Sequence, residues 1–276
     1  MPDASCLKGR VLAKSLRRLD NVSLTTRSGL ALRILLINPN TTQAVTDLVA
    51  GHVRSFIGEA ATLVPVTGRF GARYIASRAA AAIAGHAALD ALAEHVADCD
   101  AVYLACFGDP GLTALREVAP VPVVGMAEAA CQTASRAACG AGRRFGIVTG
   151  GALWGPMLRE FVAGIGLGDR LSGVRTVAPT GGEIAADPDA ALGQLAAACR
   201  ACADEDGAEA VILGGAALAG LAARIQPAVP VPVLCSVEAG TRMVLAVAGA
   251  GEPRGTTPTL ASTGLSPVLA ALLAGA

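Results

Sequence analysis

Three sequence blocks occur twice in this chain, in the same order and at a nearly constant spacing. The repeated pairs are RILLINPNTT at 33–42 with RFGIVTGGAL at 144–153, AVYLACFGDPGL at 101–112 with AVILGGAALAGL at 210–221, and APVPVVGMAEA at 119–129 with VPVPVLCSVEA at 229–239. The offsets are 111, 109 and 110 residues. Such a repeat predicts two copies of one folding unit related by a pseudo-twofold axis. At 276 residues the chain is long enough for two units.

Regular hydropathy begins at Arg33 and indicates parallel βαβ units. Short runs rich in β-branched residues alternate there with Ala-rich segments at helical spacing. The runs predict strands at 34–38, 62–66, 101–106, 121–125, 145–149, 173–178, 210–214 and 231–235. The Ala-rich segments predict helices at 43–57, 76–97, 127–139, 153–163, 189–204 and 236–249.

The predicted fold class is α/β, with two pseudo-symmetric lobes, each a mostly parallel four-stranded sheet flanked by helices. We place the first lobe at 33–140 and the second at 141–252. Residues 1–32 show no sustained period and are expected to be a disordered or extraneous tail. Residues 253–276 are expected to form a C-terminal loop and a short helix.

The distribution of charge excludes several classes of function. Residues 1–33 hold seven basic and two acidic side chains, a net charge of +5, so in a chain of zero net charge the remainder carries −5. An acidic body with 3% aromatic residues is a poor nucleic-acid binder. Residues 34–276 contain no lysine, which excludes a Schiff-base lysine and a Walker-type phosphate lysine there.

The cysteines and the apolar segments bear on where the chain is found. The eight cysteines form no disulfide framework, and residues 1–30 lack the apolar core of a secretory signal. The longest uncharged run, 255–276, is interrupted by prolines and hydroxyl residues, so no membrane span is expected. We therefore expect a cytoplasmic location with reduced thiols and no membrane partner.

The repeat and the predicted strands point to one candidate cleft. Parallel sheets place their sites at the carboxyl ends of strands, and two facing lobes would bring those ends together. By the repeat, Cys106 is equivalent to Gly215, and Asn38 is equivalent to Thr149. We expect all four residues near the cleft.

The segments INPNTT at 37–42 and YLACFGDPGL at 103–112 resemble the aspartate/glutamate/hydantoin racemase superfamily, most closely its hydantoin and allantoin racemase branch. The likeness covers 33–250. It implies two flavodoxin-like lobes, no cofactor and no metal, and one cysteine in each lobe on either side of the substrate's α-carbon. A homodimer or higher homo-oligomer is implied as possible. Cys106 matches the first-lobe cysteine, whereas Gly215 stands where the second cysteine of the family is found.

Cys106 is the predicted catalytic residue. A thiol has a pKa of about 8.5, which oriented backbone amides or a helix N-terminus can lower, and the turn after Cys106 leads into a predicted helix. An enolate-like intermediate needs preorganised donors. The predicted substrate-binding residues are Asn38, Asn40, Thr41, Thr42, Phe107 and Gly108 in the first lobe, and Thr149, Gly150, Gly214, Gly215 and Ala216 in the second. The second acid/base is left open among a water, Cys235, Asp109, Glu128 and Glu238.

These observations favour a cofactor-independent racemase or isomerase, acting by thiol acid/base chemistry at the α-carbon of a small carboxylate, amino acid or hydantoin-like substrate. A single-cysteine enzyme is the alternative, as a decarboxylase of substituted malonates or a cis-trans isomerase of a small diacid. Gly215 favours this alternative, because decarboxylation needs one proton delivery. A non-catalytic protein that binds small acids is a second alternative. Arg69, Arg73 and Arg78 lie between the second predicted strand and its helix, where they could reach the mouth of the cleft, although surface solvation is the favoured role.

Overall fold

The computed structural model describes residues 32–138, 144–248 and 261–275. The predicted N-terminal tail therefore lies outside the described residues, apart from Leu32. The predicted boundary between the lobes at 140 and most of the loop that begins at 253 also lie outside them. Among the described residues, no helix is long and apolar enough to cross a membrane.

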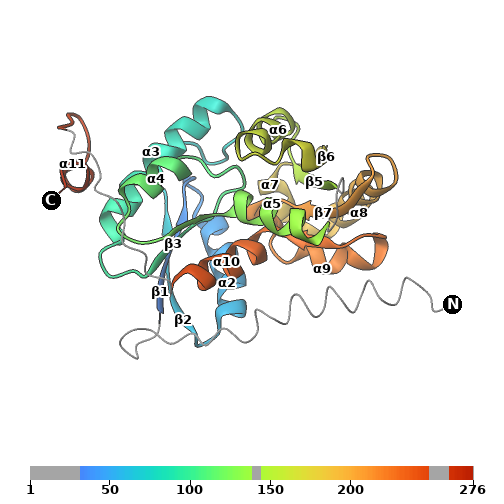
Figure 1. The fold of residues 1–276 in the computed structure, drawn as a ribbon, viewed down its shortest axis with the longest axis horizontal. Coiled ribbons are helices and arrows are strands. Elements are labelled where there is room, and N and C mark those ends of the chain that lie inside the picture. Colours follow the sequence, from blue (N-terminus) through green and yellow to red (C-terminus); the bar gives the residue numbers. More distant parts are fainter. Residues whose placement is uncertain (1–31, 139–143, 249–260, 276) are drawn as a thin grey trace.

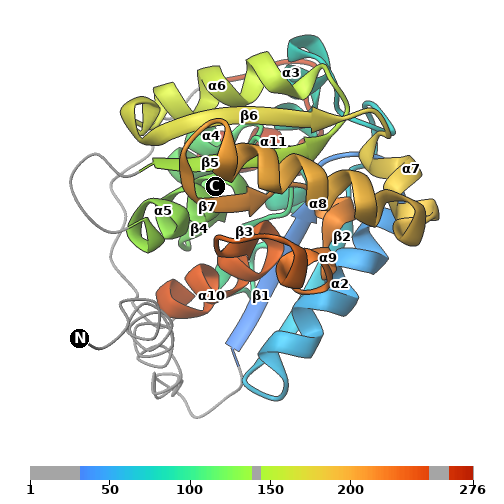
Figure 2. The same ribbon diagram turned by 90° about the vertical axis from the view of Figure 1, so that its right-hand side faces the viewer.

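Two sheets of parallel strands form the described fold (Figures 1 and 2). The first has the order β2-β1-β3-β4 and the second the order β6-β5-β7-β8, so corresponding strands occupy corresponding places. This agreement confirms the fold class and the repeat. The strands are β1 (Leu32–Asn38), β2 (Ala61–Thr67), β3 (Ala101–Leu104), β4 (Val123–Gly125), β5 (Arg144–Gly150), β6 (Leu171–Val177), β7 (Ala208–Leu213) and β8 (Val233–Cys235).

The register of the strands fixes which residues of the two lobes are equivalent. The last residue of β3, Leu104, pairs with Ile37, and the last residue of β7, Leu213, pairs with Val148. Asn38 and Thr149 each come one residue later on the central strand of their sheet. Cys106 and Gly215 each lie two residues beyond the end of the neighbouring strand. Both predicted equivalences are therefore confirmed.

Six of the helices match predicted ranges within about two residues, and four short ones complete the described set. The six are α2 (Gln43–Ile57), α3 (Arg78–His95), α5 (Met126–Ala137), α6 (Trp154–Gly164), α8 (Pro188–Asp204) and α10 (Ser236–Ala248). The short helices are α4 (Leu112–Val118), α7 (Gly181–Ala186), α9 (Leu221–Ile225) and α11 (Pro267–Leu273), with 3-10 turns η1 (Gly168–Arg170), η2 (Ala216–Leu218) and η3 (Gln226–Ala228). The last helix is the one expected after residue 253. Helix α7 is short enough to leave no periodic signal, and a capping box between Thr180 and Glu183 closes its start.

The lobes exchange helices across their interface. Helix α5 follows the last strand of the first sheet but packs on β5 and β7, whereas α10 follows the second sheet and packs on β1, β3 and β4 (Figure 1). The two helices also contact each other. The buried Tyr103 hydroxyl donates to the Val237 carbonyl on α10 at 3.1 Å. One apolar cluster consequently runs through both lobes.

Candidate active site

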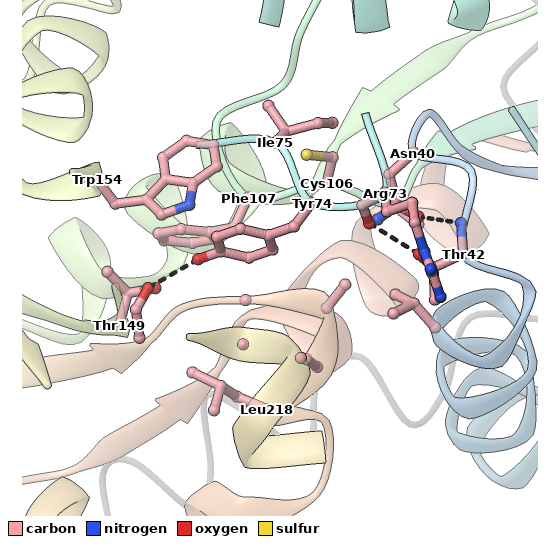
Figure 3. A pocket seen from close by; sticks show the side chains of 18 residues that line it. Asn40, Thr42, Arg73, Tyr74, Ile75, Cys106, Phe107, Thr149, Trp154 and Leu218 are labelled. Carbon is pink, nitrogen blue, oxygen red and sulfur yellow. Dashed lines mark hydrogen bonds between the residues drawn. The ribbon is translucent and has the colours of Figure 1, made fainter. Parts of the chain in front are cut away.

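A cavity lies between the lobes at the carboxyl ends of their strands, as the repeat predicts (Figure 3). Both lobes contribute to its wall. The lining residues are Asn40, Thr42, Val45, Arg73, Tyr74, Ile75, Ala105, Cys106, Phe107, Thr149, Gly150, Trp154, Gly181, Gly182, Gly215, Ala216, Ala217 and Leu218. Eight of the twelve predicted site residues belong to this set.

Cys106 lies on the first-lobe side of the cavity, just beyond the buried strand β3. The strand continues its pairing as far as Ala105, whose N–H donates to the Ile37 carbonyl at 2.8 Å. The chain then turns sharply, and the Asp109 N–H donates to the Cys106 carbonyl at 3.1 Å. Asp109 adopts a positive φ of 46° in this turn. The thiol-bearing residue is 8% exposed, and the exposed part faces the cavity.

Electrostatics around Cys106 favour the neutral thiol. Burial, and after it the nearby Asp109, raises the pKa of Cys106 well above its ordinary value. The amides at the start of α5 do not serve the thiol, because the N–H groups of Ala127 and Glu128 donate to the Asp109 carboxylate at 2.9 and 2.8 Å. The sequence-based prediction of a lowered thiol pKa is therefore wrong. Burial also raises the pKa of Asp109, to about 7.

A polar network follows β1 and shapes the first-lobe wall. Asn38 is buried, and its side-chain amide donates to Asn40 Oδ1 and to Thr46 Oγ1, each at 2.9 Å. The Thr42 N–H also donates to Asn40 Oδ1 at 2.9 Å, and the Thr42 hydroxyl donates to the Arg73 carbonyl at 2.8 Å. Asn40 and Thr42 thus reach the cavity, whereas Asn38 supports them from behind.

The remaining first-lobe residue of the INPNTT segment, Thr41, lies outside the lining of this cavity. Its N–H donates to the Ala72 carbonyl at 3.2 Å. This bond ties the loop after β1 to the segment that carries Arg73 and Tyr74. Thr41 thus helps to position a wall of the cavity.

On the second-lobe wall, the place equivalent to Cys106 is taken by Gly215, which leaves space instead of a thiol. Thr149, Gly150, Gly215 and Ala216 line the cavity. Gly214 and Gly215 were predicted to contact a substrate, but their N–H groups already have acceptors within the protein. The Gly214 N–H donates to the Val148 carbonyl at 2.9 Å, and the Gly215 N–H donates to Ser236 Oγ at 3.2 Å. Gly215 has a positive φ of 144°, a conformation that disfavours any residue with a side chain.

Two glycines behind the lining permit close approach of aromatic rings across the lobe interface. A Cβ on Gly214 would lie 2.3 Å from Phe107 Cε1, and one on Gly108 would lie 2.6 Å from Trp154 Cζ3. These two glycines therefore position Phe107 and Trp154 and do not themselves line the cavity.

Tyr74 and Trp154 are the aromatic lining residues that were not predicted from the sequence. Trp154 begins α6, and Tyr74 lies in the loop between β2 and α3. The Tyr74 side chain reaches across the cleft, where its hydroxyl donates to the Gly150 carbonyl at 3.1 Å (Figure 3). With Phe107, they give the cavity three aromatic side chains in a chain that is 3% aromatic. The one feature of the sequence that could have indicated Tyr74 is its place in a strand-to-helix loop, because such loops often hold binding and catalytic residues.

The cavity is nearly free of charge. Among the described residues that line it, Arg73 is the one charged side chain. Of its neighbours in sequence, Arg69 pairs with Asp90 at 2.5 Å and Arg78 pairs with Glu160 on α6. The alternative role at the cleft mouth is therefore confirmed for Arg73, whereas Arg69 and Arg78 form ion pairs.

The other side chains predicted as candidate acid/bases lie outside the lining of the cavity. Cys235 Sγ lies 4.0 Å from His52 Nε2, at the interface between β8 and α2. Glu128 and Glu238 lie in the first turns of α5 and α10, where they pair with Arg116 and Arg242. Asp109 caps α5. None of the four belongs to the described lining.

Comparisons with known proteins agree on one family. The model described as Asp/Glu/hydantoin racemase matches residues 34–244. A hydantoin racemase from Paenarthrobacter aurescens is 34% identical over 224 residues, which are 80% of this chain and 92% of that protein. A crystal structure of allantoin racemase from Pseudomonas fluorescens superposes with a TM-score of 0.75 at 28% identity, covering 87% of this chain and 96% of that one. Unliganded arylmalonate decarboxylase has a TM-score of 0.55 at 18% identity over 83% of this chain and 97% of its own, a likeness in fold alone.

Proposed function

The chain belongs to the Asp/Glu/hydantoin racemase family, and from this premise we propose that it racemises 5-substituted hydantoins with Cys106 as a catalytic acid/base. The observation that carries the proposal is the composition of the cavity around Cys106: three aromatic rings, several glycines and alanines, and Arg73 as the one charged lining side chain among the described residues.

This lining suits a neutral ring better than a dianion. Burying a carboxylate without a partner is costly, so a site for aspartate or glutamate would need several fixed cations. A hydantoin ring carries no formal charge and presents amide-like N–H and carbonyl groups. An apolar substituent at carbon 5 would gain from contact with Phe107 and Trp154, because aromatic side chains contribute large apolar surfaces.

The chemistry assigned to Cys106 is removal of the proton from carbon 5. The thiolate takes that proton, and the carbanion is delocalised onto the neighbouring carbonyl as an enolate. Asn40 and Thr149 are the uncharged polar groups proposed to contact the ring. Burial that raises the pKa of Cys106 also gives the thiolate, once formed, a strong tendency to regain a proton.

The location and assembly of the enzyme are part of this proposal. The described cysteines are free and buried, which is typical of proteins in a reducing compartment and supports the cytoplasm. A homodimer or higher homo-oligomer stays a prediction, to be measured by size-exclusion chromatography with light scattering.

The test is deuterium exchange at the α-carbon, followed by proton NMR in D₂O beside chiral chromatography. The panel holds both enantiomers of 5-benzylhydantoin and 5-isobutylhydantoin, with allantoin, aspartate, glutamate and phenylmalonate as competitors. We expect the wild type to exchange and racemise the hydantoins, and Cys106→Ala to lose about 10²–10⁴-fold of the racemisation. Preference for aspartate or glutamate would contradict the substrate class. Release of CO₂ from phenylmalonate without hydantoin exchange would instead establish the decarboxylase alternative.

A further inference from the structure

A racemase needs an acid on the face opposite to its base, and the second lobe provides no cysteine for that role. Gly215, the residue equivalent to Cys106, has no side chain, and the nearest atoms to an ideal Cβ there are those of Leu218 at 3.3 Å and Thr149 Oγ1 at 3.8 Å. Cys235 faces His52 instead of the cavity. Apart from a water in the space beside Gly215, the acid must therefore come from another residue of the lining.

Few side chains of the lining can exchange a proton. Among the described lining residues, Cys106, Tyr74 and Arg73 are the titratable ones. An arginine does not lose its proton in proteins, which leaves Tyr74 as the partner for the thiol. Its ordinary pKa of about 10 is within about two units of a thiol's, whereas an aliphatic hydroxyl such as that of Thr149 is a far weaker acid.

The hydroxyl of Tyr74 is held on the second-lobe wall, although its backbone belongs to the first lobe. It donates to the Gly150 carbonyl at 3.1 Å, and an ideal Cβ on Gly151 would lie 2.8 Å from it. Cys106 stands on the first-lobe wall of the same cavity (Figure 3). The two groups thus approach a ligand from opposite lobes.

The surroundings of the phenol suit a group that gives up and regains a proton. Burial raises the pKa of Tyr74, which keeps it protonated at rest, while a hydrogen bond from the Gly181 backbone and one with the Trp154 side chain act in the opposite direction. Those two contacts would stabilise a transient phenolate. The capping box at Thr180 fixes the start of α7, and with it Gly181.

We propose that Tyr74 is the second catalytic acid/base, acting on the face of the substrate opposite to Cys106; this inference rests on the proposed function. In one direction the Cys106 thiolate breaks the C–H bond and becomes a thiol, and the Tyr74 O–H bond breaks as its proton forms the new C–H bond on the other face. The phenolate that remains is the base for the reverse direction. Because both groups are protonated at rest, the Cys106 thiol must first lose its proton to solvent; the pair then shares one proton, and each turnover in either direction balances.

The experiment follows deuterium exchange of each hydantoin enantiomer separately in D₂O, using Tyr74→Phe, Cys106→Ala and wild type. Tyr74→Phe keeps the ring and removes the hydroxyl. We expect it to lose racemisation by about 10²-fold or more, while one enantiomer, whose proton faces Cys106, still exchanges with retention of configuration. Cys106→Ala should show the mirror pattern, with exchange confined to the other enantiomer.

Two matched variants separate a proton-transfer role from a structural one. Tyr103→Phe removes the hydroxyl of the chain's other tyrosine, which is buried at the lobe interface, and should racemise both enantiomers with little change. Thr149→Val tests the rival hydroxyl. The inference is overturned if Tyr74→Phe racemises at the wild-type rate, if it loses exchange of both enantiomers equally, or if Thr149→Val shows the one-sided pattern. A wild type inert on every hydantoin overturns the proposed function, and this inference with it.

Discussion

Replacing Gly214 by alanine tests how tightly the lobe interface fixes Phe107 beside Cys106. The new Cβ would lie 2.3, 2.4 and 2.7 Å from three atoms of the Phe107 ring, so the ring must move by about 1 Å to reach an ordinary contact. Overpacking of this kind costs about 1–3 kcal/mol. The backbone conformation of Gly214 is one that alanine can adopt. Alanine also lowers the conformational entropy of the unfolded chain, which offsets about 0.4–1 kcal/mol of that cost. We expect a net loss of about 1–2 kcal/mol.

Urea unfolding followed by circular dichroism measures this loss as a lower midpoint at unchanged slope. The matched control is Gly193→Ala in α8, where nothing lies within 4 Å of the ideal Cβ and alanine should stabilise by up to about 1 kcal/mol. Because Phe107 lines the cavity, Gly214→Ala should also reduce racemisation, by up to about 100-fold for a 1 Å misplacement. A variant as stable and as active as the wild type would refute the inference that Phe107 is fixed by this contact.

Three further substitutions probe the buried polar groups and the backbone of the site. Asn38→Ala leaves Asn40 and Thr46 without their buried donor and should cost about 1–3 kcal/mol in urea unfolding. Asp109 has its pKa raised from 3.8 to about 7, so the folded state holds a proton that the unfolded state has lost; stability should fall as pH rises from about 4 to about 7, by up to roughly 4 kcal/mol. Unfolding of Asp109→Asn across the same pH range should lack that slope. Gly215→Cys places a side chain at a φ of 144° and should lose about 1–3 kcal/mol by thermal unfolding, instead of simply restoring a second thiol.

The repeat carried most of what could be predicted about the site. Because parallel strands of equal order end at equal places, the repeat alone predicts that Cys106, Thr149 and Gly215 lie around one cleft, and the structure has them there. Tyr74 escaped prediction for a physical reason. It lies in an irregular loop of the first lobe, and its hydroxyl meets the second lobe, so its role depends on how the lobes pack and not on its own neighbourhood in the sequence.

The hydrogen-bond partners of the backbone N–H groups near the site also could not be predicted from the sequence. Position at a strand end suggested that the amides of Gly214 and Gly215 would serve a substrate, yet the sheet and Ser236 use both. Likewise, the amides at the start of α5 serve Asp109 and not Cys106. Every buried N–H needs an acceptor. The N–H groups at a strand or helix terminus are therefore available to a substrate only where no acceptor within the protein already binds them.

The distance between the two proposed acid/bases depends on the lobe interface. A continuous buried core joins the lobes there, which opposes a hinge motion between them. Helices α5 and α10 each pack on the sheet of the other lobe, and the buried bond from Tyr103 to Val237 joins β3 to α10. The ion pair of Arg78 with Glu160 joins α3 to α6, but both side chains are more than 60% exposed, so this pair adds little. Separating the lobes would expose one continuous apolar cluster, at about 25 cal/mol for each Å² of apolar surface. Cys106 and the Tyr74 hydroxyl are therefore held on facing walls by the same packing that folds the chain, which is the preorganisation that proton transfer on both faces of one carbon requires.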